Sequence, residues 1–148
     1  MMIREGGCLC GAVRFRVLGE PINVRICHCR SCQKATGSPF FARALFDQQA
    51  IDVAGETARH ASSEALDRVF CKTCGTSLFS WRRNGAAAGV ALAAFDDRNA
   101  IAPTEHIWFS EKLGFCNGPL FVNPFFSLPR YPFAGVVLLY GVGAQAAT

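Results

Sequence analysis

Apolar and polar residues alternate over residues 13–17, where Val13, Phe15 and Val17 are separated by two arginines. A period of two indicates a strand with one buried face. Further short runs are rich in Phe, Val and Ile and are too short for ordinary helices. We therefore predict additional strands at residues 40–46, 50–53, 66–70, 77–81, 90–95 and 106–109. This pattern predicts an all-β chain.

Helical character is expected only at residues 31–36, which follow a group of cysteines and precede Gly37, a residue that commonly ends a helix. Residues 96–99 read as a turn. Beyond residue 115 we expect loops and an edge strand, because prolines interrupt regular structure there. The apolar run at residues 133–144 is shorter than the roughly 20 residues of a membrane-spanning helix.

The composition fits one independently folding unit, and we expect residues 1–148 to form a single domain. Apolar residues make up 51% of the chain, and 13 residues are phenylalanine. The net charge of +4 is spread out, with no basic run longer than Arg82 and Arg83, so a nucleic-acid partner is not expected. The N-terminus lacks an apolar export signal, which favours a cytoplasmic protein without a membrane partner.

Seven of the eight cysteines fall into three groups with metal-ligand spacing, and Cys116 stands apart. In a reducing cytoplasm such clusters indicate metal binding rather than disulfides. The sequence Cys71-Lys72-Thr73-Cys74-Gly75 is typical of a zinc knuckle, in which both thiolates face one ion. The members of the three groups are Cys8 and Cys10; Cys27, Cys29 and Cys32; and Cys71 and Cys74.

Seven ligands divide naturally into four for a structural zinc and three for a catalytic zinc with an open position. The compact triplet Cys27, Cys29 and Cys32 is the candidate catalytic site. This leaves a closed structural site, formed by Cys8, Cys10, Cys71 and Cys74. Spacing alone leaves open a different division, in which the first two cysteines of the triplet join the zinc knuckle. Either division predicts two zinc ions per chain.

Three cysteine motifs and their glycines together resemble the glutathione-dependent formaldehyde-activating enzyme family, which includes centromere protein V. The motifs occur in the family's order, and the resemblance covers about residues 5–112, including the segment Glu105-His106-Ile107-Trp108-Phe109. The segment 113–148 departs from the family. The motifs themselves are Gly7-Cys8-Leu9-Cys10-Gly11, the run from Cys27 to Ser38, and Phe70-Cys71-Lys72-Thr73-Cys74-Gly75-Thr76.

This resemblance implies a single domain of several coiled antiparallel sheets held together by zinc, similar to the Mss-like fold of the Rab-binding zinc chaperones. It also implies a structural zinc on Cys8, Cys10, Cys71 and Cys74, and a second zinc on the triplet, where glutathione engages the active site. Family members are described as carbon-sulfur lyases.

We therefore expect a zinc-dependent enzyme acting on a thiol or thiol adduct, most concretely glutathione and formaldehyde giving S-hydroxymethylglutathione. Zinc lowers the pKa of a bound thiol, and no Ser-His-Asp set or carboxylate pair competes for a catalytic role. The alternative is a non-catalytic zinc-containing β module that binds a protein or nucleic acid.

The remaining candidates surround the triplet. His28 lies between two ligands, and alternation along an extended chain predicts that it points away from the ion, to support a ligand from behind or to face solvent. Phe40 and Phe41 are candidates to line a pocket, and Arg30 and Lys34 are candidates to meet a substrate carboxylate. We expect His60 and His106 to occupy surface or strand positions, and Cys116 to behave as a small apolar residue.

Overall fold

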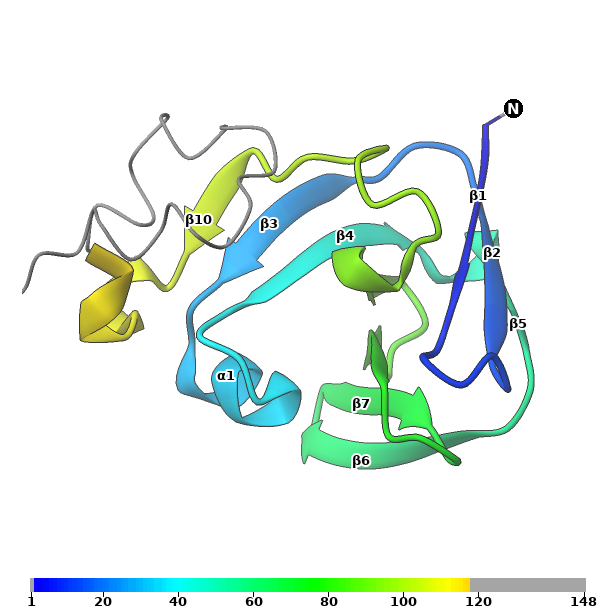
Figure 1. The fold of residues 1–148 in the computed structure, drawn as a ribbon, viewed down its shortest axis with the longest axis horizontal. Helices are drawn as coiled ribbons and strands as arrows, with labels where there is room; N and C mark the ends of the chain where they lie inside the picture. The colour runs from blue at the N-terminus through cyan, green and yellow to red at the C-terminus, as the bar shows by residue number, and fades with distance from the viewer. Residues whose placement is uncertain (1, 118–148) are drawn as a thin grey trace, which may run out of the picture. The chain divides into compact units, whose positions relative to one another are not determined.

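The computed structural model describes residues 2–117 (Figure 1). The chain divides into two units, Met1–Leu113 and Gly114–Thr148. Of the second unit, only the 3-10 turn η4 (Gly114–Asn117) is described. The loops, the edge strand and the apolar run expected further on lie outside the described residues, and a single domain over residues 1–148 stays a prediction.

The first unit is mostly β, as predicted, and contains two open sheets. One sheet has the strand order β1-β2-β5, and the other has the order β10-β3-β4-β9-β8-β7-β6. Neighbouring strands are antiparallel in both sheets except for β10 and β3, which are parallel. The strands are β1 (Ile3–Gly7), β2 (Arg14–Leu18), β3 (Asn23–Cys27), β4 (Phe41–Asp47), β5 (Ile51–Ala54), β6 (Thr57–Ser63), β7 (Leu66–Cys71), β8 (Ser77–Arg82), β9 (Ala87–Ala91) and β10 (Glu105–Ile107).

Most predicted strands are confirmed within one or two residues, but two end earlier than predicted. The run at residues 90–95 belongs to β9 only up to Ala91 and then forms the 3-10 turn η2 (Leu92–Ala94). The run at residues 106–109 leaves β10 after Ile107, and a second 3-10 turn, η3 (Phe109–Glu111), follows Trp108. Strands β1, β3 and β6 were not predicted.

Phenylalanine rings join the two sheets. The ring of Phe15 on β2 meets the rings of Phe79 on β8 and Phe95 edge to face, at centroid distances of 5.2 and 5.4 Å. Each ring is buried, and full burial of such a side chain stabilises the fold by roughly 1.5–3 kcal/mol. The alternation that predicted β2 therefore places its apolar face against the larger sheet.

The single helix of residues 2–117 is α1 (Arg30–Thr36), close to the predicted segment. It begins after Cys29, whose sulfur accepts a hydrogen bond from the backbone of Cys32 at 3.4 Å. It ends at Gly37, whose left-handed backbone suits glycine. Figure 1 shows α1 directly after β3. No helix within residues 2–117 has the length and apolar character needed to cross a membrane.

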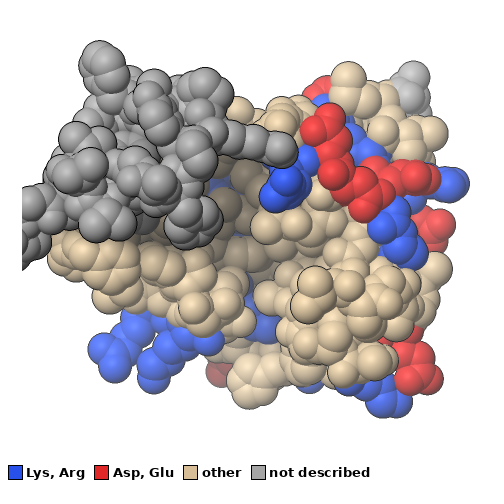
Figure 2. All heavy atoms as spheres, viewed as in Figure 1, with Lys and Arg blue, Asp and Glu red and all other residues tan. Residues whose placement is uncertain are grey.

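Acidic and basic side chains are intermixed over β1 and β2 on the face drawn in Figure 2. Arg14 and Arg16 on β2 form ion pairs with Asp96 and with Glu5 on β1, between exposed side chains. Exposed pairs of this kind contribute little to stability. Because the two signs of charge alternate, this part of the surface is not a uniform positive patch.

Candidate functional site

Four cysteines meet where the turn after β1 faces the turn between β7 and β8. The sulfur atoms of Cys8, Cys10, Cys71 and Cys74 all lie within 4.8 Å of one another. The Cys8–Cys10 and Cys10–Cys71 sulfur distances are 3.5 and 3.9 Å. A tetrahedral zinc with bonds of about 2.3 Å separates its sulfurs by roughly 3.8 Å. The four residues therefore fit one tetrahedral ion, and all of them are free thiols.

Hydrogen bonds from the surrounding chain stabilise negative charge on this four-cysteine cluster. The backbone N–H of Val13 donates to the sulfur of Cys8 at 3.2 Å. The hydroxyl and backbone of Thr76 hold the pKa of Cys74 at about 5. The same hydroxyl oxygen accepts from the N–H of Leu9, so it ties the two turns together. The cluster is thus built as a closed site that joins distant parts of the chain.

Three further cysteines meet at the end of β3 and the beginning of α1. The sulfurs of Cys27, Cys29 and Cys32 lie within 4.8 Å of one another, and no fourth Cys, His, Asp or Glu of residues 2–117 completes the group. The structure therefore groups the cysteines as four and three, and it does not bring the triplet to the zinc knuckle. Three soft ligands with an open fourth position fit a zinc ion accessible to a ligand.

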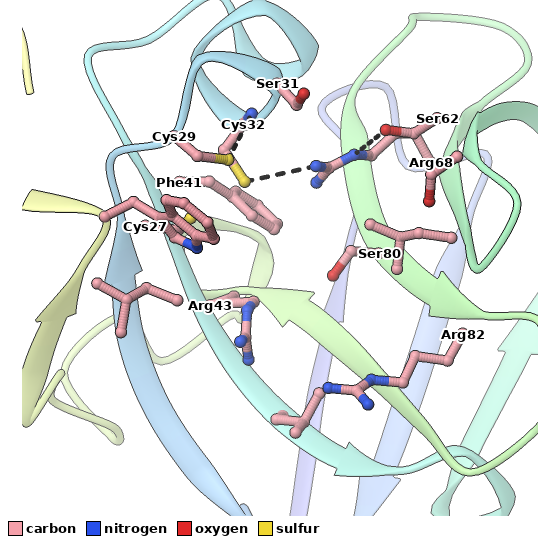
Figure 3. A pocket seen from close by; sticks show the side chains of 15 residues that line it. Cys27, Cys29, Ser31, Cys32, Phe41, Arg43, Ser62, Arg68, Ser80 and Arg82 are labelled. Atoms are coloured by element: carbon pink, nitrogen blue, oxygen red, sulfur yellow. Dashed lines mark hydrogen bonds between the residues drawn. The ribbon is translucent and has the colours of Figure 1, made fainter. Parts of the chain in front are cut away.

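The three-cysteine cluster forms one wall of a pocket of about 290 Å³ (Figure 3). Arginines reach the pocket from β4, β7 and β8, and no Asp or Glu occurs among its described lining residues. The lining residues are Cys27, Cys29, Ser31, Cys32, Phe41, Arg43, Leu45, Ser62, Ser63, Leu66, Arg68, Ser80, Arg82, Ile107 and Trp108. The pocket thus combines metal-binding sulfurs with positive charge.

Arg68 crosses the pocket toward the cluster, as Figure 3 shows. Its Nη2 donates to the sulfur of Cys32 at 3.4 Å, and its Nε donates to the hydroxyl of Ser62 at 3.5 Å. The hydrogen bond from Cys27 and then the charge of Arg68 outweigh burial and lower the pKa of Cys32 to about 5. The same pairing and burial raise the pKa of Cys27. Without a metal, these interactions favour the thiolate at Cys32 over the thiolate at Cys27.

Arg43 lies on β4 beside the same cluster. Its Nη1 donates to the side-chain oxygen of Asn23 at 3.3 Å. Burial lowers the pKa of Arg43, the charges of Arg25 and Arg82 act in the same direction, and the sulfurs of the cluster oppose the change. Arg43 is therefore a partly desolvated cation close to other cations.

His28 points away from the cluster, but the alternative of a surface position is wrong, because only 1% of the residue is exposed. Its Nε2 lies 2.8 Å from Nδ1 of His106 on β10, and the two rings stack at 5.1 Å. The ring of Phe109 packs edge-on against His28 at 5.3 Å. Burial lowers the pKa of His28, and the charges of His106 and Lys112 act in the same direction. The sequence did not indicate this stacked pair.

Of the other residues that the sequence singled out, only some lie where they were expected. Phe41 lines the pocket. Phe40 is not among the lining residues, and its ring instead lies 5.8 Å from the ring of His28. The exposed side chains of Arg30 and Lys34 on α1 are absent from the pocket lining. His60 and His106 are exposed strand residues, as predicted.

Cys116 lies in η4, and the structure places it in neither cysteine cluster. The sequence analysis missed the pocket arginines Arg43, Arg68 and Arg82. The sequence did contain a signal for Arg43, because this residue interrupts the apolar run Phe40-Phe41-Ala42-Arg43-Ala44-Leu45-Phe46. An arginine flanked by buried positions needs a polar partner or a ligand.

Two curated proteins are similar to this chain in sequence. In Schizosaccharomyces pombe, an uncharacterized lyase is 35% identical over 81 residues, which cover 55% of this chain and 59% of the relative. A Halomonas elongata protein, provisionally named a glutathione-dependent formaldehyde-activating enzyme, is 35% identical over 89 residues, covering 53% of this chain and 55% of the relative. The chain thus matches little more than half the length of these relatives.

A crystal structure of a Rhodobacter sphaeroides protein has a similar fold. The TM-score is 0.54 at 24% identity, and the match covers 69% of this chain and 98% of that protein. The family model described as glutathione-dependent formaldehyde-activating enzyme matches residues 3–111, which contain both cysteine clusters and the pocket. This chain therefore belongs to the glutathione-dependent formaldehyde-activating enzyme family.

Proposed function

We propose that this protein is a zinc-dependent enzyme of the lyase type that acts on a thiol or thiol adduct, most concretely glutathione with formaldehyde. Family membership supports a glutathione-related formaldehyde-activating or lyase function. The observation that carries the finer proposal is the three-cysteine cluster on the pocket wall, to which residues 2–117 add no fourth ligand. A substrate thiol that enters the pocket would supply that ligand.

In this proposal Cys27, Cys29 and Cys32 hold the catalytic zinc, and the four-cysteine cluster holds a structural zinc. Zinc bound at the triplet supplies the acidity that converts a thiol into a thiolate at neutral pH. Arg68 stabilises the negative charge on Cys32 and fixes the position of that sulfur. The buried wall formed by Phe41 and Leu45 limits the access of water to the reacting atoms.

The reaction joins the thiol sulfur to the carbonyl carbon of formaldehyde. A carbon–sulfur bond forms, the π electrons of the carbonyl pass to oxygen, and the proton lost by the thiol ends on that oxygen. The product is S-hydroxymethylglutathione, and the reverse reaction is a carbon-sulfur lyase step. Because free thiols persist in a reducing compartment, we also assign the protein to the cytoplasm.

The test is calorimetric titration of the zinc-loaded protein with glutathione, followed by NMR measurement of the rate of adduct formation with formaldehyde. We expect binding and a faster reaction, and we expect Cys29→Ser to lose both. Cys116→Ser is the matched control, because this thiol belongs to neither cluster. Absence of binding at millimolar glutathione would exclude glutathione as substrate. Binding without acceleration would favour the non-catalytic module or a different carbon-sulfur reaction.

A further inference from the structure

The pocket beside the three-cysteine cluster carries more positive charge than the protein neutralises. Arg43, Arg68 and Arg82 line it, and no carboxylate occurs among its described lining residues. The ion pairs found within residues 2–117 use other basic side chains. Arg68 is buried, Arg43 is half-buried and Arg82 is exposed. A buried or half-buried cation without an anionic partner is costly, so this group of arginines indicates a ligand that supplies negative charge.

The three arginines are not equivalent. Arg68 is already engaged, because it donates to the sulfur of Cys32 and to the hydroxyl of Ser62. Arg43 and Arg82 extend from β4 and β8, the two strands that flank β9, into the same part of the pocket (Figure 3). The charge of Arg82 contributes to the lowered pKa of Arg43. An anion between these two side chains would remove the repulsion.

The neighbouring strand leaves space for the side chain of Arg43. A Cβ atom at Gly89 on β9 would lie 2.7 Å from Cδ of Arg43 and would collide with the hydroxyl of Ser80. Any larger residue at position 89 therefore displaces Arg43 from its present place. The absence of a side chain at Gly89 allows the guanidinium to lie over β9 beside the cluster.

Charge balance gives the chemical class of the ligand. The three guanidinium groups carry the same amount of charge as three cysteine thiolates, with opposite sign. When a divalent ion is bound to the cluster, the pocket therefore has a net charge of two positive charges. We propose that Arg43 and Arg82 form a carboxylate subsite, through which the protein selects thiols that carry carboxylates over neutral or cationic thiols. The identity of the thiol rests on the proposed function, whereas the subsite itself rests on the arginines.

The first test needs no variant. The zinc-loaded protein is titrated calorimetrically with glutathione and with its diethyl ester, which retains the thiol and the peptide but lacks both carboxylates. Loss of charge-assisted hydrogen bonds to arginine predicts that the ester binds roughly ten- to a hundredfold more weakly. Equal affinities for the two compounds would overturn the subsite.

The second test separates the subsite from the thiol chemistry. S-methylglutathione keeps both carboxylates but has no free thiol. We expect Arg43→Gln and Arg82→Gln each to weaken its binding by about tenfold or more. Arg98→Gln removes the same charge from an exposed turn and should bind as wild type does. Melting curves of the variants confirm that they are folded.

The outcomes distinguish the two proposals. Variants that bind S-methylglutathione as wild type does overturn the subsite, and so does undetectable binding of S-methylglutathione by wild type at about 10 mM. Neither result affects the reaction assigned to the three-cysteine cluster. The remaining outcome is that the arginine variants bind S-methylglutathione more weakly than wild type does, while wild type binds glutathione no more tightly than S-methylglutathione. This outcome supports the subsite and contradicts the proposed function.

Discussion

Nη2 of Arg68 lies 3.4 Å from the sulfur of Cys32, and this contact links β7 to the first turn of α1. Arg68 is only 8% exposed, and its guanidinium also lies 5.8 Å from the ring of Phe41. A buried guanidinium needs a negative partner, and the thiolate of Cys32 supplies one. The cation and the cluster therefore stabilise each other.

Replacing Arg68 with Met should weaken the acidity of Cys32. The hydrogen bond from Cys27 is the largest cause of the low pKa and remains, but the contribution of Arg68 is lost. We expect the pKa of Cys32 in reduced, metal-free protein to rise from about 5 by roughly one unit. Alkylation by iodoacetamide, measured against pH and located by mass spectrometry, reports this change.

Arg59→Met is the matched control, because Arg59 is an exposed arginine on β6 whose guanidinium lies over Trp81. It should leave the alkylation profile of Cys32 unchanged. If the alkylation profile of Cys32 in Arg68→Met is the same as in wild type, the cysteine pair alone sets the acidity of Cys32.

The two cysteine clusters should contribute unequally to stability. We expect metal analysis of protein purified without chelator to give two zinc ions per chain. Cys71→Ser should unfold the chain or lower its Tm by more than about 10 °C, because the four-cysteine cluster joins segments far apart in sequence. Cys29→Ser should have a much smaller effect, since the triplet lies within one local segment.

Circular dichroism and thermal melting of the two variants compare these effects directly, with Cys116→Ser as the control. Equal damage from Cys71→Ser and Cys29→Ser would assign a structural role to both clusters. One zinc per chain, with the triplet freely alkylated, would contradict a catalytic zinc.

The predicted strands have apolar buried faces, and two of the three strands that were missed, β1 and β6, break this rule. In β1 the apolar side chain of Ile3 is exposed, while Arg4 is buried and donates to the carbonyl of Gly19 at 2.5 Å. This inverts the expected pattern. In β6 most side chains are exposed, so pairing with β7 rather than burial defines the strand. The local periodicity of the sequence does not reveal the hydrogen-bond partner of Arg4 or the pairing of β6 with β7.

The cysteine groups were predictable because ligand spacing is local, whereas the pocket depends on tertiary contacts. Cys29 and Cys32 are brought together by one turn of α1. The arginines of the pocket come from three strands, and their convergence follows from the sheet order. Sequence proximity instead favoured Arg30 and Lys34, which are near the triplet along the chain but do not line the pocket.

His28 should make stability depend on pH. Burial holds its pKa below the usual 6.5, so the folded protein binds this proton less readily than the unfolded chain does. Its contribution is therefore fully present above about pH 6.5 and is lost as the pH falls. Urea unfolding at pH 7.5 and 5.5 should show a smaller loss of stability in His28→Gln than in wild type.

The difference is limited to about 1.4 kcal/mol per pH unit, which corresponds to one proton. Both proteins contain the same cysteines, so protonation of the clusters cancels in the comparison. His60→Gln changes an exposed histidine on β6 and should behave as wild type does. Parallel losses in wild type and His28→Gln would assign the pH dependence to other groups.

Trp108 should contribute to ligand binding more than to stability. Its backbone is left-handed, with φ at 56°, and no other non-glycine residue of residues 2–117 has a positive φ. This conformation costs a non-glycine residue about 1–2 kcal/mol, and glycine in turn loses about 0.5–1 kcal/mol through greater freedom of the unfolded chain. The residue is 61% exposed and lines the pocket, so truncation removes little buried area.

Trp108→Gly should therefore keep the free energy of unfolding unchanged or raise it by up to about 1 kcal/mol, while binding glutathione several-fold more weakly. Phe109→Gly is the comparison, because that ring packs against His28 and its loss should destabilise the fold by about 1–3 kcal/mol. Chemical unfolding and calorimetry of both variants measure the two quantities. If Trp108→Gly is destabilised as much as Phe109→Gly, packing of the indole outweighs the backbone cost, and Trp108 is retained for stability rather than for the ligand.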